Sequence, residues 1–479
     1  MNKFFKKIIL LTTILWGGVI IGNTEAETVG EYSKTDVKEM IREVALAKKI
    51  PPEILKAIAL SESGELKHFN DDGTPFISED GGIGLMQITL TEKEIREENI
   101  DVEKLKWDIR YNIEIAAYKL NQKWGWDQYF LPTINQHDRK YLEDWYFAVM
   151  AYNGLSKAND PGLYGDEAYP EKVYQYIRDN ALQDVGETPA LSINYEAGSN
   201  TMKFPIDVDR YDWPTSIRTS QDLEEGDVVY TWNPDKKYSK LRKTINSAYD
   251  YIEIFHDTPL KIVGGPYETE NEENLYVMYE VEGNGVEGYI SSSNIIHSEK
   301  INVFPDIIYG RDGEVPRAVS FLQQRSIING HDDGTFKPDD DLLRRHAAKL
   351  IVHALDLKLP QGYTMKGIDM EPGDLGYEDM LIAEAHGLIV GNEGILNPNG
   401  FLKRSQMAKI LVRAYDDVYE KPTAEAEFSD RAEFWNYEDI NTLKHNGITV
   451  ADPFRSFEDV TRWQFSLFLE RSIRLEEKK

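Results

Sequence analysis

A glutamate at the end of an apolar helical stripe is the residue of this sequence best placed to do chemistry. Ile54, Ile58 and Glu62 are spaced four residues apart, so they share one face of a predicted helix. Gly64 is a helix stop signal, and in the last turn burial and the helix dipole both disfavour a charged carboxylate. A carboxyl kept protonated near neutral pH suits general acid catalysis, although the same spacing also fits a solvent-exposed glutamate at a helix end.

A polar, glycine-rich loop follows this helix and ends in residues 81–87, GGIGLMQ. Glycines there allow the backbone to come close to a ligand. Asp80 directly precedes them and offers a second carboxylate, although Glu79-Asp80-Gly81 also fits an ordinary turn. The sequence therefore predicts a helix-end carboxyl facing a ligand-binding loop.

Four short motifs resemble those of the soluble-type (SLT) lytic transglycosylases, a lysozyme-like family. They are Glu62-Ser63, Gly84-Leu85-Met86-Gln87, Ala151-Tyr152-Asn153-Gly154 and Tyr169-Pro170, in the order and rough spacing of that family. The resemblance implies that Glu62 cleaves the MurNAc–GlcNAc β-1,4 bond of peptidoglycan and leaves a 1,6-anhydro end. It also implies that four side chains bind the sugar, with Tyr152 the best candidate for stabilising the reacting centre: Ser63, Gln87, Tyr152 and Asn153.

Two alternatives to this activity stay open. Related goose-type lysozymes hydrolyse the bond and commonly carry a carboxylate two residues after the glutamine of the second motif. Thr89 holds that position here, which favours transglycosylation, whereas Asp80 keeps hydrolysis as the alternative. The other is a non-catalytic wall-binding or S-layer-associated protein with an inactive lysozyme fold.

The elements that must position these residues are predominantly helical. Apolar residues recur at helical spacing in four further stretches, and Pro51-Pro52 opens the helix of Glu62. We therefore predict a mainly α, lysozyme-like catalytic domain over residues 27–182.

The pattern changes after this domain. Residues 183–225 show little periodicity and are predicted to be a linker with some local strand. Five or six short β-rich runs over residues 226–298 predict a small β-barrel. Gly288-Tyr289-Ile290 resembles the closing strand of bacterial SH3-like modules, which implies either a ligand in cell-wall peptide or a spacer.

From residue 301 the chain repeats itself with a period of roughly 60 residues, over 301–360, 361–420 and 421–479. The pattern resembles S-layer homology (SLH) repeats. That resemblance implies an all-α bundle of three copies in a pseudo-threefold arrangement, which binds secondary cell-wall polysaccharide. The fold class is therefore multidomain: a lysozyme-like domain, an SH3-like β-barrel module and an SLH bundle.

Arginines begin the second predicted helix of each copy, and they match the arginine of the SLH motif. Arginine forks two hydrogen bonds to a carboxylate, although pairing within a repeat is the structural alternative. We expect Arg462 to matter most, because Trp435 matches an aromatic position of the family in the same repeat. The predicted polymer-binding residues are Arg344, Arg404, Arg462 and Trp435.

The amino-acid composition limits the classes of partner, metal and cofactor that this chain is expected to bind. The chain has 54 Lys and Arg against 83 Asp and Glu, a net charge of −29, which argues against nucleic acid and anionic membranes. There is no cysteine, so thiol catalysis and Cys-ligated metals are excluded. The histidines show no HExxH spacing, and we expect neither metal nor cofactor.

Residues 1–26 are predicted to be a secretory signal peptide. Lys3, Lys6 and Lys7 precede an apolar run, and Thr24 and Ala26 fit a cleavage site. An uncleaved anchor helix is the alternative, but the run is short for a membrane span. We therefore expect a secreted monomer at the cell wall or S-layer of a Gram-positive-type bacterium. Its expected partners are peptidoglycan and secondary cell-wall polysaccharide, with no membrane contact after cleavage.

Overall fold

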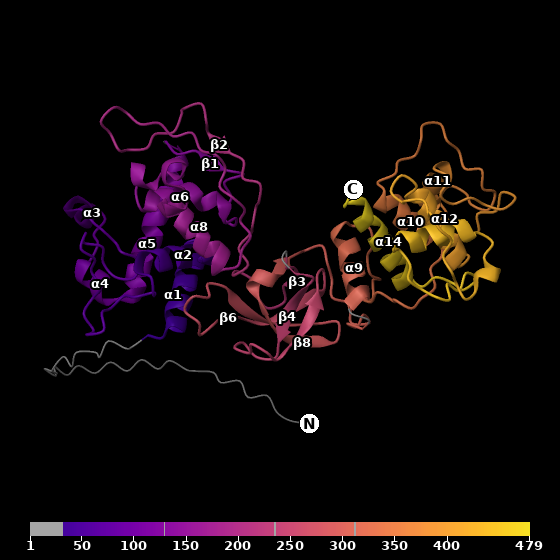
Figure 1. Cartoon of the computed structure of the whole chain (residues 1–479), viewed down its shortest axis with the longest axis horizontal. Coiled ribbons are helices and arrows are strands. Elements are labelled where there is room, and N and C mark those ends of the chain that lie inside the picture. Colours follow the sequence, from indigo (N-terminus) through magenta and orange to yellow (C-terminus); the bar gives the residue numbers. More distant parts are fainter. Residues whose placement is uncertain (1–31, 129, 234–235, 311–312) are drawn as a thin grey trace, which may run out of the picture.

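The computed structural model describes residues 32–479 except 129, 234–235 and 311–312. The predicted signal peptide lies outside the described residues. Three parts follow one another along the long axis of the molecule (Figure 1): a helical domain, a β-module and a bundle of helix pairs. No helix in the described part is both long and apolar enough to cross a membrane.

The helical domain is organised around α2 (Pro52–Ser63), whose Ile54 and Ile58 are fully buried, as the sequence predicts. Pro52 occupies the first turn, where its missing N–H costs no hydrogen bond. The helices α1 and α8 pack against α2, and α5 packs on α1 and α6. The other helices of this domain are α1 (Lys34–Ala47), α3 (Glu92–Glu97), α4 (Val102–Trp107), α5 (Ile109–Trp124), α6 (Tyr146–Tyr152), α7 (Pro161–Tyr164) and α8 (Tyr169–Asp179).

Residues 183–225 differ from the predicted linker, because they pack along the helical domain. Their strand β2 (Arg210–Tyr211) pairs in parallel with β1 (Thr133–Ile134). Trp213 is buried, with its ring centroid 5.3 Å from that of Tyr146 and 5.5 Å from that of Tyr174. The weak periodicity of this segment reflects an irregular backbone laid over helices, and its aromatic residues complete their core.

The β-module forms one antiparallel sheet of seven strands, more than the five or six that the sequence predicts. The strand order is β5-β4-β8-β7-β6-β3-β9, and β6 carries register shifts opposite β7. Val229, Leu260, Tyr279 and Ile290 lie in its buried core. The strands are β3 (Val228–Thr231), β4 (Tyr238–Arg242), β5 (Tyr251–Phe255), β6 (Pro259–Glu268), β7 (Val277–Gly283), β8 (Val286–Ser291) and β9 (Ile295–His297).

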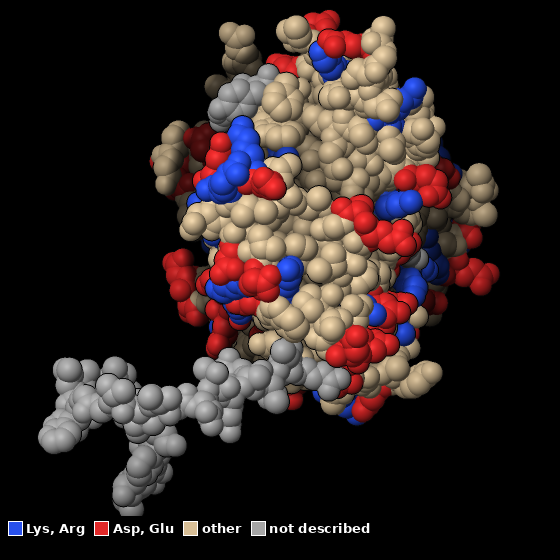
Figure 2. All heavy atoms as spheres, turned by 90° about the vertical axis from the view of Figure 1, so that its left-hand side faces the viewer, with Lys and Arg blue, Asp and Glu red and all other residues tan. Residues whose placement is uncertain are grey.

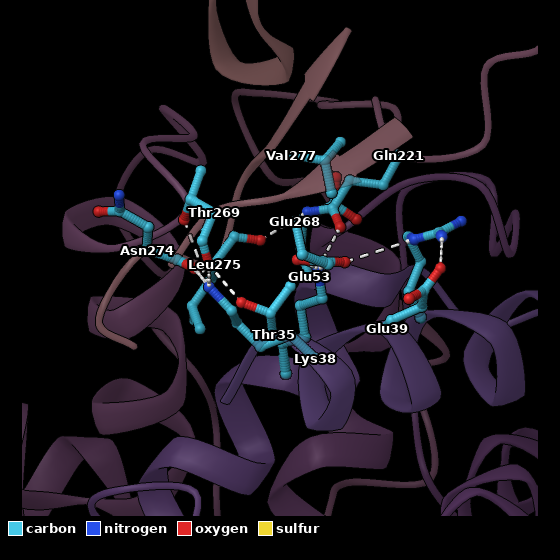
Figure 3. A network of polar contacts seen from close by, with 12 residues as sticks. Thr35, Lys38, Glu39, Glu53, Gln221, Glu268, Thr269, Asn274, Leu275 and Val277 are labelled. Atoms are coloured by element: carbon cyan, nitrogen blue, oxygen red, sulfur yellow. Dashed lines mark hydrogen bonds and ion pairs between the residues drawn. The ribbon is translucent and has the colours of Figure 1, made fainter. Parts of the chain in front are cut away.

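A buried polar network joins the helical domain to the β-module (Figure 3). Lys56 Nζ on α2 donates to both carboxylate oxygens of Glu268, at 2.6 and 2.8 Å, and to Gln221 Oε1 at 2.9 Å. Lys38 Nζ on α1 donates to the backbone oxygens of Thr269 and Asn271, at 2.6 and 2.8 Å. Both side chains of the Lys56–Glu268 pair are almost wholly buried. The two parts therefore meet through fixed, directional contacts.

The C-terminal bundle consists of three helix pairs, one in each predicted repeat, and its helices pack across copies. The second helix of each copy packs on the first helix of the next, and α14 closes the cycle on α9. Backbone hydrogen bonds form a matching ring: Leu342 N donates to Val460 O, Val460 N to Leu402 O, and Leu402 N to Leu342 O. The helices are α9 (Glu314–Gln324), α10 (Arg344–Ala354), α11 (Tyr377–Ala385), α12 (Arg404–Ala414), α13 (Tyr437–His445) and α14 (Arg462–Glu476).

Figure 2 shows the end of the molecule that carries the helical domain. Acidic and basic side chains are interspersed around an uncharged central area of this face, and acidic groups gather along one side. Both signs of charge are therefore mixed on this face of the helical domain.

Candidate active site

Glu62 lies in the last turn of α2, which ends at Ser63, where the sequence predicts it. Gly64 follows at φ 72°, and its N–H caps the helix by donating to Leu60 O. The Tyr169 hydroxyl at the start of α8 donates to Glu62 Oε1 at 2.6 Å. Burial raises the pKa of Glu62 to about 7; the Tyr169 hydrogen bond opposes this shift, and the negative charge of Asp80 adds to it. The carboxyl is therefore divided between its acid and base forms near neutral pH, as a group that must act as both requires.

The loop GIGLMQ is fixed by a buried histidine. Gly84 has φ +68°, and a Cβ built there would lie 2.5 Å from the His68 ring, so only glycine fits. His68 Nδ1 accepts a hydrogen bond from Leu85 N at 3.1 Å, so Nε2 carries the proton and donates to Lys106 O at 2.9 Å. Burial lowers the pKa of His68 to about 4, which keeps the ring neutral in this role.

Two further side chains hold the same loop. Asn112 on α5 accepts from Met86 N and donates to Ile83 O, both at 2.9 Å. The Tyr152 hydroxyl at the end of α6 donates to Met86 O at 3.0 Å. Burial and the charge of Glu62 raise the pKa of Tyr152 well above its usual value, so it stays a neutral donor. Tyr152 thus lies within the electrostatic reach of Glu62 and also orders the loop.

The other predicted sugar-binding residues lie in different settings. Gln87, at φ +46°, folds back so that Nε2 donates to Gly84 O at 2.7 Å. Ser63 donates to Ala59 O at 2.8 Å and accepts from Lys67 N, which are local helix-end contacts. Asn153 is exposed, and its Oδ1 accepts from Asn159 Nδ2 at 3.0 Å. Gln87 belongs to the loop, Tyr152 contacts it from α6, and Ser63 adjoins Glu62. The sugar-binding role of all four residues stays a prediction.

Asp80 is exposed on the loop, where Ser78 Oγ donates to its carboxylate. This hydrogen bond lowers the pKa of Asp80, so the group is ionised at neutral pH. Its charge acts on Glu62. A second, ionised carboxylate therefore belongs to the electrostatic surroundings of the site.

Sequence reasoning missed three residues of this site as functional positions. Tyr169 belongs to the motif Tyr169-Pro170, and its place in that motif was the only feature of the sequence that pointed to it. His68 and Asn112 act on the loop from different segments of the chain, and their contacts depend on tertiary packing. No local pattern could have singled them out.

The repeat arginines form a second candidate site, and each spans two copies. Arg344 Nε donates to Leu396 O at 2.8 Å, Arg404 Nε to Phe454 O at 2.6 Å, and Arg462 Nε to Phe336 O at 2.9 Å. Arg344 and Arg404 are buried, and Arg462 is partly buried. The guanidinium groups are thus engaged in joining one copy to the next, a use that the sequence pattern did not indicate.

Trp435 and Arg462 belong to the same repeat, but the contacts that each makes lie with different copies. Trp435 is 52% exposed, and the centroid of its ring lies 5.0 Å from Lys409 Nζ of α12, the helix that begins with Arg404. Arg462 instead contacts the first copy, through Phe336 and Asn329. The difference arises because each copy packs across the next, so residues of one repeat line different junctions.

Two protein families match the chain, one in the helical domain and one at the start of the C-terminal bundle. The family Transglycosylase SLT domain matches residues 39–161, and the family S-layer homology domain matches residues 310–348. The chain therefore carries an SLT domain and an SLH domain in one polypeptide.

Among curated proteins, the chain is similar to an S-layer protein of Bacillus thuringiensis subsp. finitimus, with 28% identity over 160 residues. It is also similar to the S-layer protein sap of Bacillus anthracis, with 27% identity over 159 residues. Each match covers 32% of this chain, against 20% and 19% of those relatives. The chain thus spans about a fifth of the length of these relatives.

Proposed function

We propose that this protein is an exported lytic transglycosylase that cleaves the MurNAc–GlcNAc β-1,4 bond of peptidoglycan. The observation that carries the proposal is Glu62, a carboxyl with a pKa of about 7 beside the loop that His68 and Asn112 hold. The match of residues 39–161 to the SLT domain supports it. No metal or cofactor takes part in the proposed reaction.

In the proposed reaction, protonated Glu62 gives its proton to the glycosidic oxygen as the C1–O bond breaks. The resulting carboxylate takes the proton of the muramic C6 hydroxyl, whose oxygen closes onto C1. The products are a free GlcNAc 4-hydroxyl and a 1,6-anhydro-muramic end, Glu62 is again protonated, and no water is consumed. Tyr169 supports the cycle because its hydrogen bond stabilises the intermediate carboxylate form.

Mass spectrometry of the products from purified peptidoglycan tests this proposal. We expect muropeptides that end in 1,6-anhydro-MurNAc, together with their loss in a Glu62→Gln variant. Reducing MurNAc ends in their place would contradict transglycosylation. Digestion in water labelled with ¹⁸O adds a direct control, since hydrolysis incorporates the label and the proposed reaction does not.

Hydrolysis is the second candidate function, and Asp80 is the observation that favours it. Asp80 is ionised and its charge acts on Glu62, so it could activate a water for attack at C1. An Asp80→Asn variant separates the two reactions. Hydrolysis requires that base, whereas transglycosylation needs only Glu62.

We further propose that the repeats anchor the enzyme by binding secondary cell-wall polysaccharide. The SLH match and the similarity to S-layer proteins support this role. Trp435 and Lys409 offer an exposed ring and a cation beside the junction that holds Arg404. Sedimentation with walls stripped or not stripped of that polymer is the test, and equal binding to both would overturn the proposal.

A further inference from the structure

A cavity of about 810 Å³ lies between the β-module and the helix bundle, and cations dominate its lining. The β-module contributes the segments that hold residues 236–237 and 255–256, and the bundle contributes α9, α14 and the end of α13. Among the described lining residues, Glu470 alone is a carboxylate. The basic residues are Lys236, Lys237, Arg317, Arg471, Arg474 and Lys478. Such a concentration stands out in a chain with a net charge of −29.

The three arginines have carboxylate partners in the described structure. Arg474 pairs with Glu470 and Asp257, and Arg317 Nε lies 3.6 Å from Glu470 Oε1. Arg471 Nη2 donates to Glu314 Oε1 at 2.7 Å. These pairs order the cavity wall and join the bundle to the β-module.

The three lysines differ from the arginines. Within the described residues, no carboxylate lies at ion-pair distance from Lys236, Lys237 or Lys478. Lys236 and Lys237 come from the β-module, whereas Lys478 follows α14 of the bundle. Among the described residues, lysines without a carboxylate partner therefore lie on two sides of the cavity.

A histidine in the same wall packs against the segment that carries the two lysines of the β-module. Burial lowers the pKa of His256, although hydrogen bonds to the backbone of Lys236 and Asn233 oppose that shift. Its ring packs 5.0 Å from that of Trp232, centroid to centroid.

We propose that this cavity binds a polyanionic chain through its phosphate or carboxylate groups. Lysine ammonium groups attract such oxyanions without demanding one geometry, and the space exceeds that of a single anion. Because the chain as a whole is acidic, long-range attraction is weak and the local cluster supplies the affinity. This site is separate from the junctions of Arg344, Arg404 and Arg462, since none of these residues lines it.

The full chain without residues 1–26 is the material for the test, and fluorescent inorganic polyphosphate and oligogalacturonate are the probes. A variant Lys236→Glu/Lys237→Glu/Lys478→Glu reverses the unpaired charges. The matched control, Lys48→Glu/Lys49→Glu/Lys140→Glu, makes the same change of net charge at exposed positions of the helical domain. A neutral dextran shows whether binding needs charge.

We expect the cavity variant to lose at least about tenfold in affinity and the control less than about twofold, with binding weakened by salt. Binding of polyphosphate alone assigns the site to phosphate, and binding of both probes assigns it to oxyanions in general. Binding to neither probe, or an equal loss of affinity in the cavity variant and the control variant, overturns the proposal. A Lys→Arg triple variant that retains affinity, with unchanged thermal unfolding in all variants, excludes misfolding as the cause.

Discussion

The two ends of α2 each hold a carboxyl whose pKa is raised by burial, but the hydrogen-bond partners of the two carboxyls differ. Glu53 in the first turn is fully buried, and it accepts hydrogen bonds from Thr219 Oγ1 at 2.7 Å and Ser220 N at 3.1 Å. Glu62 in the last turn is only partly buried, and Tyr169 is its one hydrogen-bond donor in the described structure. Only the short helix α2 separates the two carboxyls, yet Glu53 is fully buried with two donors and Glu62 is partly buried with one.

The comparison shows that a raised pKa alone does not identify a catalytic carboxyl. Burial is the main cause at both sites. The two carboxyls differ in the number of hydrogen-bond donors that the protein places around each. Both oxygens of Glu53 are engaged, whereas Oε2 of Glu62 accepts no hydrogen bond within the described residues. Within the described residues, Oε2 of Glu62 is thus open to a further hydrogen-bond partner, as the proposed general acid role requires.

The largest expected effect is on activity, in Glu62→Gln. Loss of general acid catalysis should lower turnover by roughly 10²–10⁴-fold, measured as release of soluble muropeptides. Retention of more than about a tenth of the activity would remove Glu62 from this role. Glu65→Gln, an exposed glutamate three residues further on, is the matched control and should keep full activity.

The same variant should change the pH dependence of stability. The pKa of Glu62 is about 7 in the folded protein against an ordinary value of 4.5, so the folded state loses stability as pH rises from the lower value to the higher. Glutamine removes the titration. Glu62→Gln should therefore match the parent near pH 4 and exceed it at pH 8, since a tenfold change in the ionisation constant of the carboxyl corresponds to about 1.4 kcal/mol. Urea unfolding at both pH values measures this, and an equal difference at the two would contradict it.

Glu53→Ala should lower stability and leave the chemistry of the site intact. Removing the carboxyl leaves Thr219 Oγ1 and Ser220 N buried without their acceptor, at a cost of about 1–3 kcal/mol for each unsatisfied group. We expect a lower midpoint in urea and an unchanged pH profile at temperatures where the variant is folded. A changed pH profile would show that the two ends of α2 are coupled.

Tyr169→Phe tests the difference between Glu62 and Glu53, because it removes the one hydrogen-bond donor that Glu62 has in the described structure. The hydrogen bond lowers the pKa of Glu62, so its loss raises that pKa and moves the alkaline limb of activity to higher pH. Loss of the bond should also reduce turnover by about fivefold, the equivalent of about 1 kcal/mol. Tyr176→Phe on the same helix is the control. A limb that moves to lower pH would contradict the assignment.

The smallest effect is expected in the repeats, where the contrast between an open and an engaged group recurs. Trp435 is exposed and Arg344 is buried across a junction. Trp435→Ala should weaken binding to cell walls by about 1 kcal/mol with unchanged stability, whereas Arg344→Ala should mainly lower the unfolding temperature of the bundle. Sedimentation and calorimetry separate these outcomes, and a reversal of the two effects would refute the distinction.

Much of this site could be predicted from local sequence. The stripe of Ile54, Ile58 and Glu62, the stop at Gly64 and the helix starts at the three arginines all depend on neighbours in the chain, and the structure has them. His68 and the packing of residues 183–225 could not be predicted. Their positions depend on contacts between distant segments, which leave no periodic signal.

The arginines show a different limit of sequence reasoning. Their spacing correctly marks the second helix of each copy, but it does not tell which copy each side chain contacts. Trp435 belongs to the same repeat as Arg462, but membership of one repeat does not place two side chains at the same junction. The helices instead pack from each copy to the next, so the partner of each arginine comes from another repeat.

Leu342, Leu402 and Val460 join the three copies of the repeat in a closed ring. Deleting one copy should therefore affect this bundle differently from an open array of repeats. In a linear stack of repeats, removing the last member breaks one interface and leaves the others intact. In a closed ring every member has two neighbours, so deleting any copy breaks two of the three junctions. Evolution can therefore lengthen or shorten a stack one repeat at a time, whereas this bundle is kept or lost as a unit of three.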